Sequence, residues 1–248
     1  MAVKLYLALL WRLSAEPFDT SIPARKWAEL LGLPDPTTRG ARRIHDALRI
    51  LEADKLVRIT AQPGEGSKIQ LLEESGRGGA YTLPSTAFQR AAKDKEIEHF
   101  YFKVPTTLWT AGHIQSMSAP ALAMLLVCLS NHKASEGKRI WWSTKIFPEQ
   151  YGLSPATRAR GTKELQDRDL LSVTKELVTD SPHSSRTFTR ERVRNIYQLI
   201  NDATIPKRAP TPKPPVPAAS APTSTLRRRP TKTAKTPRAG HVSSGRGV

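Results

Sequence analysis

Thr157, Arg160 and Lys163 recur at three-residue intervals in the segment YGLSPATRARGTKELQDRDLLSV, residues 151–173. A guanidinium group forms paired hydrogen bonds with a guanine edge or a phosphate, and an ammonium group supplies a point charge to the same acceptors. A threonine hydroxyl suits a phosphate, and a threonine methyl group suits the methyl group of thymine. Taken alone, each cation also fits a solvated surface. Together, the three residues predict a face that contacts a polyanion.

The residues before these side chains predict the helix that carries them. Gly152 suits a tight turn, and Ser154 is a favourable N-cap. Pro155 then falls at the first helical position, where its missing N–H group has no cost. We therefore expect a helix over residues 154–168.

Another face of this helix is small or apolar, because it carries Gly161, Thr162 and Leu165. Arg158 lies near that core-facing side. A long basic side chain can bury its stem while its charged end reaches solvent, so Arg158 is kept among the candidate contacts.

The segments around the helix complete a pattern. We expect, in order, a strand over residues 100–105, an apolar helix over 118–131, a buried strand over 139–143, a helix over 144–151, the cationic helix, and strands over 170–178 and 188–200. Turn, cationic helix and strand is the order of a winged helix-turn-helix. In that motif the second helix lies in the major groove of DNA, and a β-hairpin wing touches the flanking backbone. Candidates on the hairpin for backbone or minor-groove contact are His183, Arg186, Arg190, Arg192 and Arg194.

The first half of the chain has the same predicted order. We expect helices over residues 3–14, 23–31 and 37–55, strands over 56–60 and 68–72, and a third strand over 81–83. Thr37 or Thr38 is the expected cap of the longest helix. The candidate DNA contacts are Arg39, Arg42, Arg43 and Arg49 on that helix and Lys68 on the hairpin.

Two segments indicate an internal repeat. LEADKLVRIT (residues 51–60) aligns with LQDRDLLSVT (residues 165–174), and a Gly-Leu pair precedes each copy, at residues 32–33 and 152–153. Any winged helix favours a leucine at the end of its second helix and an apolar pair at the start of its wing, so convergence explains the match as well as duplication does. Either origin predicts two copies of one module.

The composition favours a nucleic acid as partner. The formal net charge is +17, from 39 lysines and arginines against 22 aspartates and glutamates, a balance typical of proteins that bind polyanions. The alternatives are a merely soluble basic protein and one that meets an anionic membrane surface.

Residues 201–248 hold ten lysines and arginines, one aspartate and few large apolar side chains. Such a segment is predicted to be disordered. It is either a solubilising tail or a source of phosphate contacts that do not depend on sequence. The candidates for those contacts are Arg227, Arg228, Arg229, Lys232 and Lys235.

These patterns predict an α+β, mainly α protein. Its expected parts are a first winged-helix domain over residues 1–85, a linker over 86–99, a second winged-helix domain over 100–200, and a disordered tail rich in Pro, Lys and Arg over 201–248.

Several catalytic motifs are absent. The chain has no GxxxxGK[ST], GxGxxG or HExxH sequence, and its six histidines are scattered. We therefore expect no enzyme, no cofactor and no metal. The single cysteine, Cys128, lies in an apolar run and is expected to be buried, which fits the reducing cytoplasm and a nucleoid- or plasmid-associated protein. No membrane span is expected, because the apolar runs fall short of the ~20 residues that a bilayer requires.

Residues 1–200 resemble tandem winged-helix DNA-binding proteins of bacteria. In the second half, YGLSPATRARGTKELQDRDLL is similar to the GLS..T..R.L.EL...GLI segment of MarR-like and GntR-like regulators. It departs from them at Arg158, where those families often keep an apolar residue, and at Asp169, which replaces the usual Gly before the wing. In architecture alone, two winged helices in one chain also resemble plasmid replication initiators.

The resemblance implies sequence-specific binding of double-stranded DNA, and three hypotheses follow. The first is a transcriptional regulator. The second is a plasmid or phage replication initiator or partition protein that binds origin repeats. The third is a nucleoid-type protein that binds DNA through charge alone. We also leave open a homodimer, because one of the two winged-helix modules can mediate dimerisation instead of DNA binding.

Overall fold

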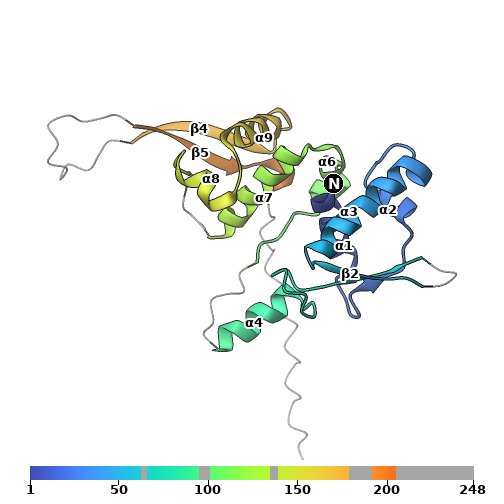
Figure 1. Ribbon diagram of the computed structural model, residues 1–248. Coiled ribbons are helices and arrows are strands. Elements are labelled where there is room, and N and C mark those ends of the chain that lie inside the picture. The colour runs from blue at the N-terminus through green and yellow to red at the C-terminus, as the bar shows by residue number, and fades with distance from the viewer. Residues whose placement is uncertain (63–65, 95–100, 135–138, 179–191, 205–248) are drawn as a thin grey trace, which may run out of the picture. The chain divides into compact units, whose positions relative to one another are not determined.

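A computed structural model describes residues 1–62, 66–94, 101–134, 139–178 and 192–204 of the chain. The described residues belong to one compact unit that runs from Met1 to Pro206. The fold is α+β and mainly helical, as predicted (Figure 1). None of the helices among the described residues has both the length and the apolar character needed to span a bilayer.

Three helices and a small sheet make up the first part of the unit. The elements are α1 (Ala2–Arg12), β1 (Asp19–Thr20), α2 (Ala24–Leu30), η1 (Pro36–Gly40), α3 (Ala41–Ala53), β2 (Val57–Thr60) and β3 (Lys68–Leu71). The sheet has the order β1-β3-β2, with both pairs antiparallel.

The third strand of this sheet is not where the sequence predicted it. Residues 81–83 form no strand, and only a single bridge between Leu72 and Ala80 lies near them. The strand is instead β1, where Asp19 pairs with Gln70 and Thr20 with Ile69. Two residues are too few to show an alternating pattern, so β1 has no signal of its own in the sequence.

The start of the long helix also differs from the prediction. A π-helical turn, η1, precedes α3, and neither Thr37 nor Thr38 caps the helix with its side chain. Gly40 lies where the two elements join, and a Cβ atom there would be 3.0 Å from the Cβ atom of Ala28 in α2. The glycine therefore lets this turn pack closely against α2.

The short helices α4 to α6 lie between the first and second halves of the chain. Residues 84–94 form α4 (Pro84–Asp94) in the segment expected to be a linker, and Ala91 on this helix is buried. Residues 101–105, expected to continue a strand, have no regular secondary structure, and Pro105 leads into α5 (Thr107–Thr110) and α6 (His113–Ser116). Proline cannot donate a ladder hydrogen bond, which is consistent with the absence of a strand.

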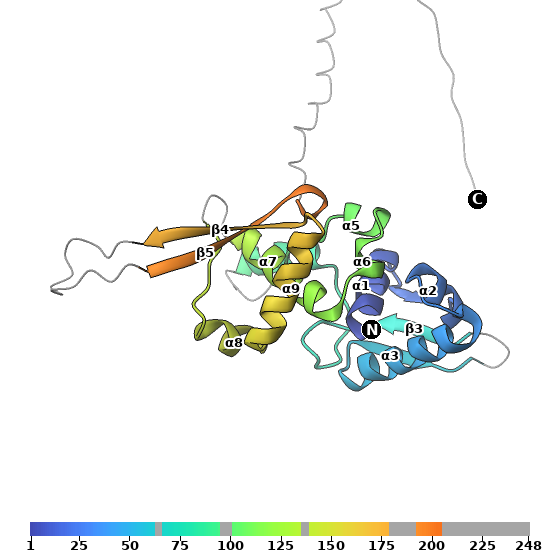
Figure 2. The ribbon, with the colours of Figure 1, turned by 90° about the horizontal axis from the view of Figure 1, so that it is seen from above.

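The second half repeats the order of the first. Its elements are α7 (Ala119–Ala134), α8 (Ile146–Tyr151), α9 (Pro155–Asp167), β4 (Leu171–Val178), β5 (Arg192–Leu199) and η2 (Asn201–Ala203). Both views place α7 beside α9 and show β4 and β5 as a long hairpin (Figures 1 and 2). The strand predicted over residues 139–143 is reduced to one bridge, from Ile140 to Tyr197.

The predicted cap of α9 is confirmed. The Ser154 hydroxyl oxygen accepts a hydrogen bond of 3.2 Å from the Thr157 amide, and Pro155 is the first helical residue. Ser154 has extended backbone angles, as an N-cap requires. Gly152, which ends α8, has a φ of +63°, in the left-handed region that favours glycine.

The two halves have matching backbone hydrogen bonds at the point where the long helix ends and the hairpin begins. We call residues 2–72 the first repeat and residues 119–200 the second repeat. The amide of Leu56 donates to the carbonyl of Leu51, and the amide of Leu170 donates to the carbonyl of Leu165, each at 2.9 Å. Helices α3 and α9 both contain 13 residues.

The residue before each hairpin has the same unusual backbone. Lys55 and Asp169 have φ angles of +56° and +54°. The two residues stand at matching places in the aligned sequences, directly before Leu56 and Leu170. At both positions the backbone thus has the left-handed conformation that glycine usually adopts, although neither residue is a glycine.

The folded unit extends past residue 200, where the tail was predicted to begin. In η2, Ala203 is fully buried. The Asn201 side chain donates to the carbonyl of Asp169 at 2.9 Å, and the carbonyl of Asp202 accepts from the Thr107 hydroxyl at 2.7 Å. The predicted tail contacts Arg227, Arg228, Arg229, Lys232 and Lys235 lie outside the described residues.

Candidate nucleic-acid interface

The three residues predicted to form a contact face on α9 have different surroundings in the structure. Arg160 is exposed, and no ion pair or hydrogen bond joins it to a residue that the structure describes. Lys163 is also exposed and lies 3.2 Å from the Asp167 carboxylate, one turn away on the helix. An exposed pair of this kind is weak, so Lys163 remains available for other acceptors.

Thr157 takes part in the cap of α9. Its hydroxyl lies 2.9 Å from the Ser154 hydroxyl, and its amide donates to the same oxygen, so the side chain is part of the helix cap. An α-helix has 3.6 residues per turn, so residues spaced by three drift around its axis. Over these six residues the drift is about 120°, so Arg160 lies between Thr157 and Lys163 on the helix surface.

Arg158 points inward, to a cluster of aromatic rings. The carbon at the centre of its guanidinium group lies 4.4 Å from the centre of the Phe147 ring, 5.4 Å from that of Tyr197 and 5.8 Å from that of Trp142. Its Nη2 atom donates to the Tyr197 hydroxyl at 2.9 Å. Among the described residues, no carboxylate pairs with this cation. Its stem and its charged end are thus both held by the protein.

The second hairpin contributes another cation–aromatic pair. The guanidinium carbon of Arg194 on β5 lies 3.9 Å from the centre of the Trp141 ring, which is 43% exposed. Arg192 stands opposite Val178 at the far end of the same strand pair. The other predicted contacts of this hairpin, His183, Arg186 and Arg190, lie outside the described residues.

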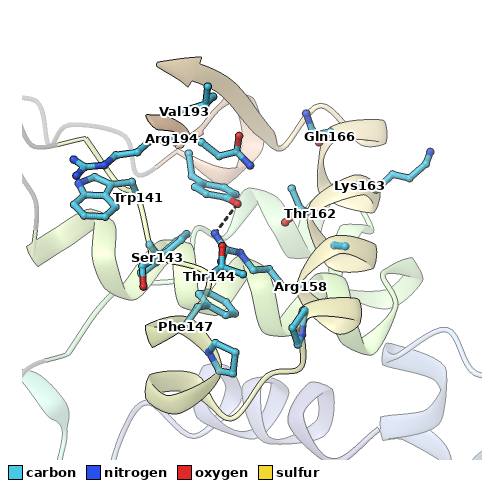
Figure 3. Close-up of a pocket in the computed structure, with 16 residues that line it drawn as sticks. Trp141, Ser143, Thr144, Phe147, Arg158, Thr162, Lys163, Gln166, Val193 and Arg194 are labelled. Atoms are coloured by element: carbon cyan, nitrogen blue, oxygen red, sulfur yellow. Dashed lines mark hydrogen bonds between the residues drawn. The ribbon is translucent and has the colours of Figure 1, made fainter. Parts of the chain in front are cut away.

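Three of the predicted cations line one cavity. This cavity has a volume of about 830 Å³ and lies between α9, β5 and residues 141–148 (Figure 3). Arg158, Lys163 and Arg194 contribute to its wall, and no aspartate or glutamate does. The close-up shows Arg194 and Trp141 on one side of the cavity and Lys163 on the other. The local potential therefore favours an anion.

The aromatic residues of the cavity were missed in the sequence. They are Trp141, Trp142, Phe147 and Tyr197. The pair Trp141–Trp142 is the visible signal, but it lies in a segment that the sequence predicted as a buried strand. Tyr197 is distant along the chain, and only the hairpin pairing brings it to the tryptophans, with 4.9 Å between the ring centres of Trp142 and Tyr197.

The first repeat exposes its candidate cations on α3. Arg42 and Arg43 are exposed and have no ion pair with the described residues. Arg49 lies 2.9 Å from Asp46 on the same helix. Two further candidates have acidic neighbours: Arg39 is 3.8 Å from Asp35, and Lys68 is 2.7 Å from Asp19.

Positive charge also gathers at the N-terminal end of α1. Burial, Arg168 and Arg43 lower the pKa of Lys4, and Glu164 opposes this shift. The pKa of the Met1 amino group is lowered by burial and by Lys4 and Arg43. Neighbouring cations contribute to both shifts, so positive charge gathers here, which suits a polyanion.

Metal ligands do not cluster in the part of the chain that the structure describes, because no group of three or more His, Cys, Asp or Glu side chains is placed to hold an ion. Comparisons of the chain with protein-family models, with curated proteins and with solved structures found no match.

Proposed function

We propose that the chain is a sequence-specific double-stranded DNA-binding protein built from two winged helix-turn-helix modules. The observation that carries the proposal is the repeated framework. Each repeat places a helix, a short sheet contact, a two-helix turn and an antiparallel hairpin in the same order. This is the order in which winged-helix proteins present a recognition helix and a wing.

The pairing in the sheets supports this proposal. In the first repeat, β1 pairs with β3, which in turn pairs with β2. In the second repeat, Ile140 bridges to β5, which pairs with β4. In both repeats, a segment before the two-helix turn thus pairs with the last strand of the hairpin. This pairing holds the hairpin beside the second helix of the turn.

Charge supports DNA as the partner. The chain has a formal net charge of +17. The second helices of the two turns, α3 and α9, expose Arg42, Arg43 and Arg160 without ion pairs to the described residues. Guanidinium groups on a helix that fits the major groove can read guanine edges as well as hold phosphates.

We favour a transcriptional regulator as the biological role. Two DNA-binding modules in one chain also favour a replication initiator or partition protein that binds repeated origin sites, and this is the second candidate. A single inverted repeat in the promoter of the gene supports the regulator. Direct repeats beside an origin support the initiator.

A footprint of the full-length protein on the DNA that flanks its gene tests the proposal. We expect one protected site that survives excess competitor DNA and moderate salt. Uniform binding that disappears with competitor would contradict sequence specificity and leave only the nucleoid-type hypothesis. The length and symmetry of the footprint report how many modules bind and whether the protein binds as a dimer.

A further inference from the structure

The cavity of the second repeat combines aromatic rings with cations, and Arg42, Arg43 and Arg160, on which the proposed DNA binding rests, are not part of it. Aromatic rings line its wall together with arginines that stack on them, and no aspartate or glutamate belongs to the wall. We propose that this cavity binds a single nucleotide unit, that is, an aromatic base together with its phosphate. The inference concerns the cavity alone and does not depend on the recognition of double-stranded DNA.

The aromatic wall suits a base. Trp141 and Trp142 belong to the segment before α8, Phe147 lies on α8, and Tyr197 lies on β5. Phe147 is fully buried, whereas Trp141 is 43% exposed at the side of the cavity in Figure 3. Bases stack on arginine guanidinium planes as well as on aromatic rings, so the stacked pair Trp141–Arg194 offers a surface to any base.

The cations suit a phosphate. Arg158 has lost part of its hydration to three aromatic rings and has no carboxylate partner among the described residues. A partly desolvated cation without an anion is unfavourable, and a bound anion would relieve that cost. One N–H group of Arg158 donates to Tyr197, and the guanidinium group has further donors for a phosphate. Lys163 and Arg194 add positive charge on opposite sides of the cavity.

Neutral polar groups are also present. The side chains of Gln166 and Asn195 line the cavity and offer both donors and acceptors for the edge of a base. Thr162, also in the wall, has a buried hydroxyl without a hydrogen-bond partner among the described residues.

The size of the cavity favours a nucleotide over an inorganic ion. Its volume of about 830 Å³ falls within the range of about 300–1,000 Å³ that is usual for small-molecule sites. A lone phosphate would leave the aromatic wall unused, and an uncharged base would leave the three cations unused. One ligand that joins both groups satisfies both parts of the wall.

Titrations of the full-length protein with adenosine 5′-monophosphate, adenosine and ribose 5-phosphate test the proposal. Binding is followed by calorimetry and by the fluorescence of the tryptophans at the cavity. We expect the monophosphate to bind with a submillimolar Kd, and each of the two partial ligands to bind about tenfold more weakly or less. A fourth titration, with a short single-stranded oligothymidylate, distinguishes the source. Binding of the oligonucleotide alone identifies a nucleotide within a strand, whereas binding of the monophosphate identifies a free nucleotide.

Variants of the cavity residues test whether the ligand binds in the cavity. Trp141→Ala and Arg194→Ala alter residues at the side of the cavity, and each is expected to weaken binding by about tenfold. Lys175→Ala, which removes an exposed cation on β4 that neither lines the cavity nor belongs to the proposed DNA contacts, is the matched control and should leave binding unchanged. Thermal unfolding of each variant shows that it is folded.

Three results would overturn the inference. One is no binding of the monophosphate or the oligonucleotide up to about 1 mM. Another is equal binding of ribose 5-phosphate and the monophosphate, which would indicate attraction by charge alone. The third is unchanged binding by both folded variants, Trp141→Ala and Arg194→Ala, which would place the ligand elsewhere.

Discussion

Gly161 of α9 meets Pro120 of α7 so closely that a Cβ atom on the glycine would lie 2.3 Å from the proline carbonyl oxygen. The same atom would lie 2.7 Å from Cγ of Met124. Helices α7 and α9 therefore pack in backbone contact at this point. A side chain of any size at position 161 would push α9 away from α7.

The first prediction concerns this contact. Gly161→Ala should lower the free energy of unfolding by about 3 kcal/mol, because a backbone atom cannot move aside as a flexible side chain can. Chemical denaturation followed by tryptophan fluorescence measures the loss. Ala159→Ser, on an exposed position of the same helix, is the control and should change stability by less than about 0.5 kcal/mol. An alanine variant as stable as the parent would refute the close packing of α7 and α9.

The second prediction concerns the residue before each hairpin. Lys55 and Asp169 have φ angles of +56° and +54°, which are unfavourable for residues with a Cβ atom. Lys55→Gly and Asp169→Gly should therefore each raise the free energy of unfolding by about 0.5–1 kcal/mol. Asp54→Gly is the control, since Asp54 has a φ of −79°, and glycine there should destabilise the protein. If both glycine variants were less stable than the parent protein, the positive φ angles would not be a source of backbone strain.

The third prediction concerns acid stability. Burial raises the pKa of Glu164, but hydrogen bonds from Ser118 and Arg168 outweigh it, and the pKa is lowered. A carboxyl group with a lowered pKa stabilises the fold above its unfolded pKa of about 4.3, and this stability is lost as the pH falls through the folded pKa.

Glu164→Gln should therefore cost about 1–2 kcal/mol at neutral pH and less below about pH 4. Denaturation curves collected at several pH values measure the difference between parent and variant. Asp167→Asn, on an exposed part of the same helix, is the control for a general effect of charge. A difference that stays constant from neutral to acidic pH would show that the carboxylate charge is not responsible.

The fourth prediction concerns the thiol of Cys128. Burial raises its pKa to about 12, and the nearby Arg158 lowers it only in part. A fully buried thiol that stays protonated is a poor nucleophile. In the native protein, Cys128 should not react with a thiol reagent such as Ellman's reagent at pH 8, and it should react fully in denaturant. Rapid reaction in the native state would contradict its burial.

The fifth prediction concerns the proposed reading of DNA sequence by α9. Arg160→Ala should weaken binding to the specific DNA site by about 1–3 kcal/mol. Fluorescence anisotropy with specific and unrelated duplexes separates base contacts from phosphate contacts. Equal losses on every duplex would show that Arg160 holds phosphate only. Arg90→Ala, an exposed arginine on α4 outside both repeats, is the matched control.

Local chemistry made much of the fold predictable. The Ser154–Pro155 cap, with the turn glycine before it, placed the start of α9, and the alignment of the two leucine-rich segments matched Leu51 with Leu165 where the backbone is the same. These features act within a few residues of one another, so they leave a trace in the sequence.

The cavity left no such trace. Arg158 was predicted to reach outward, because the sequence does not show which rings gather around it from α8, β5 and the segment before α8. The gathering of these rings depends on three-dimensional arrangement rather than on local pattern.

The single bridge between Ile140 and Tyr197 distinguishes the two repeats. In the first repeat the corresponding strand pairs two residues, Asp19 and Thr20. In the second, the chain leaves the sheet directly after Ile140, and the next two residues are the tryptophans of the cavity wall. In the second repeat, a shortened edge strand thus places the residues that follow it at the wall of a cavity rather than in a sheet. Trp141, which is 43% exposed, can change and give the cavity a different lining, whereas Trp142 also packs against Phe147, Tyr151 and Tyr197 and so belongs to the framework.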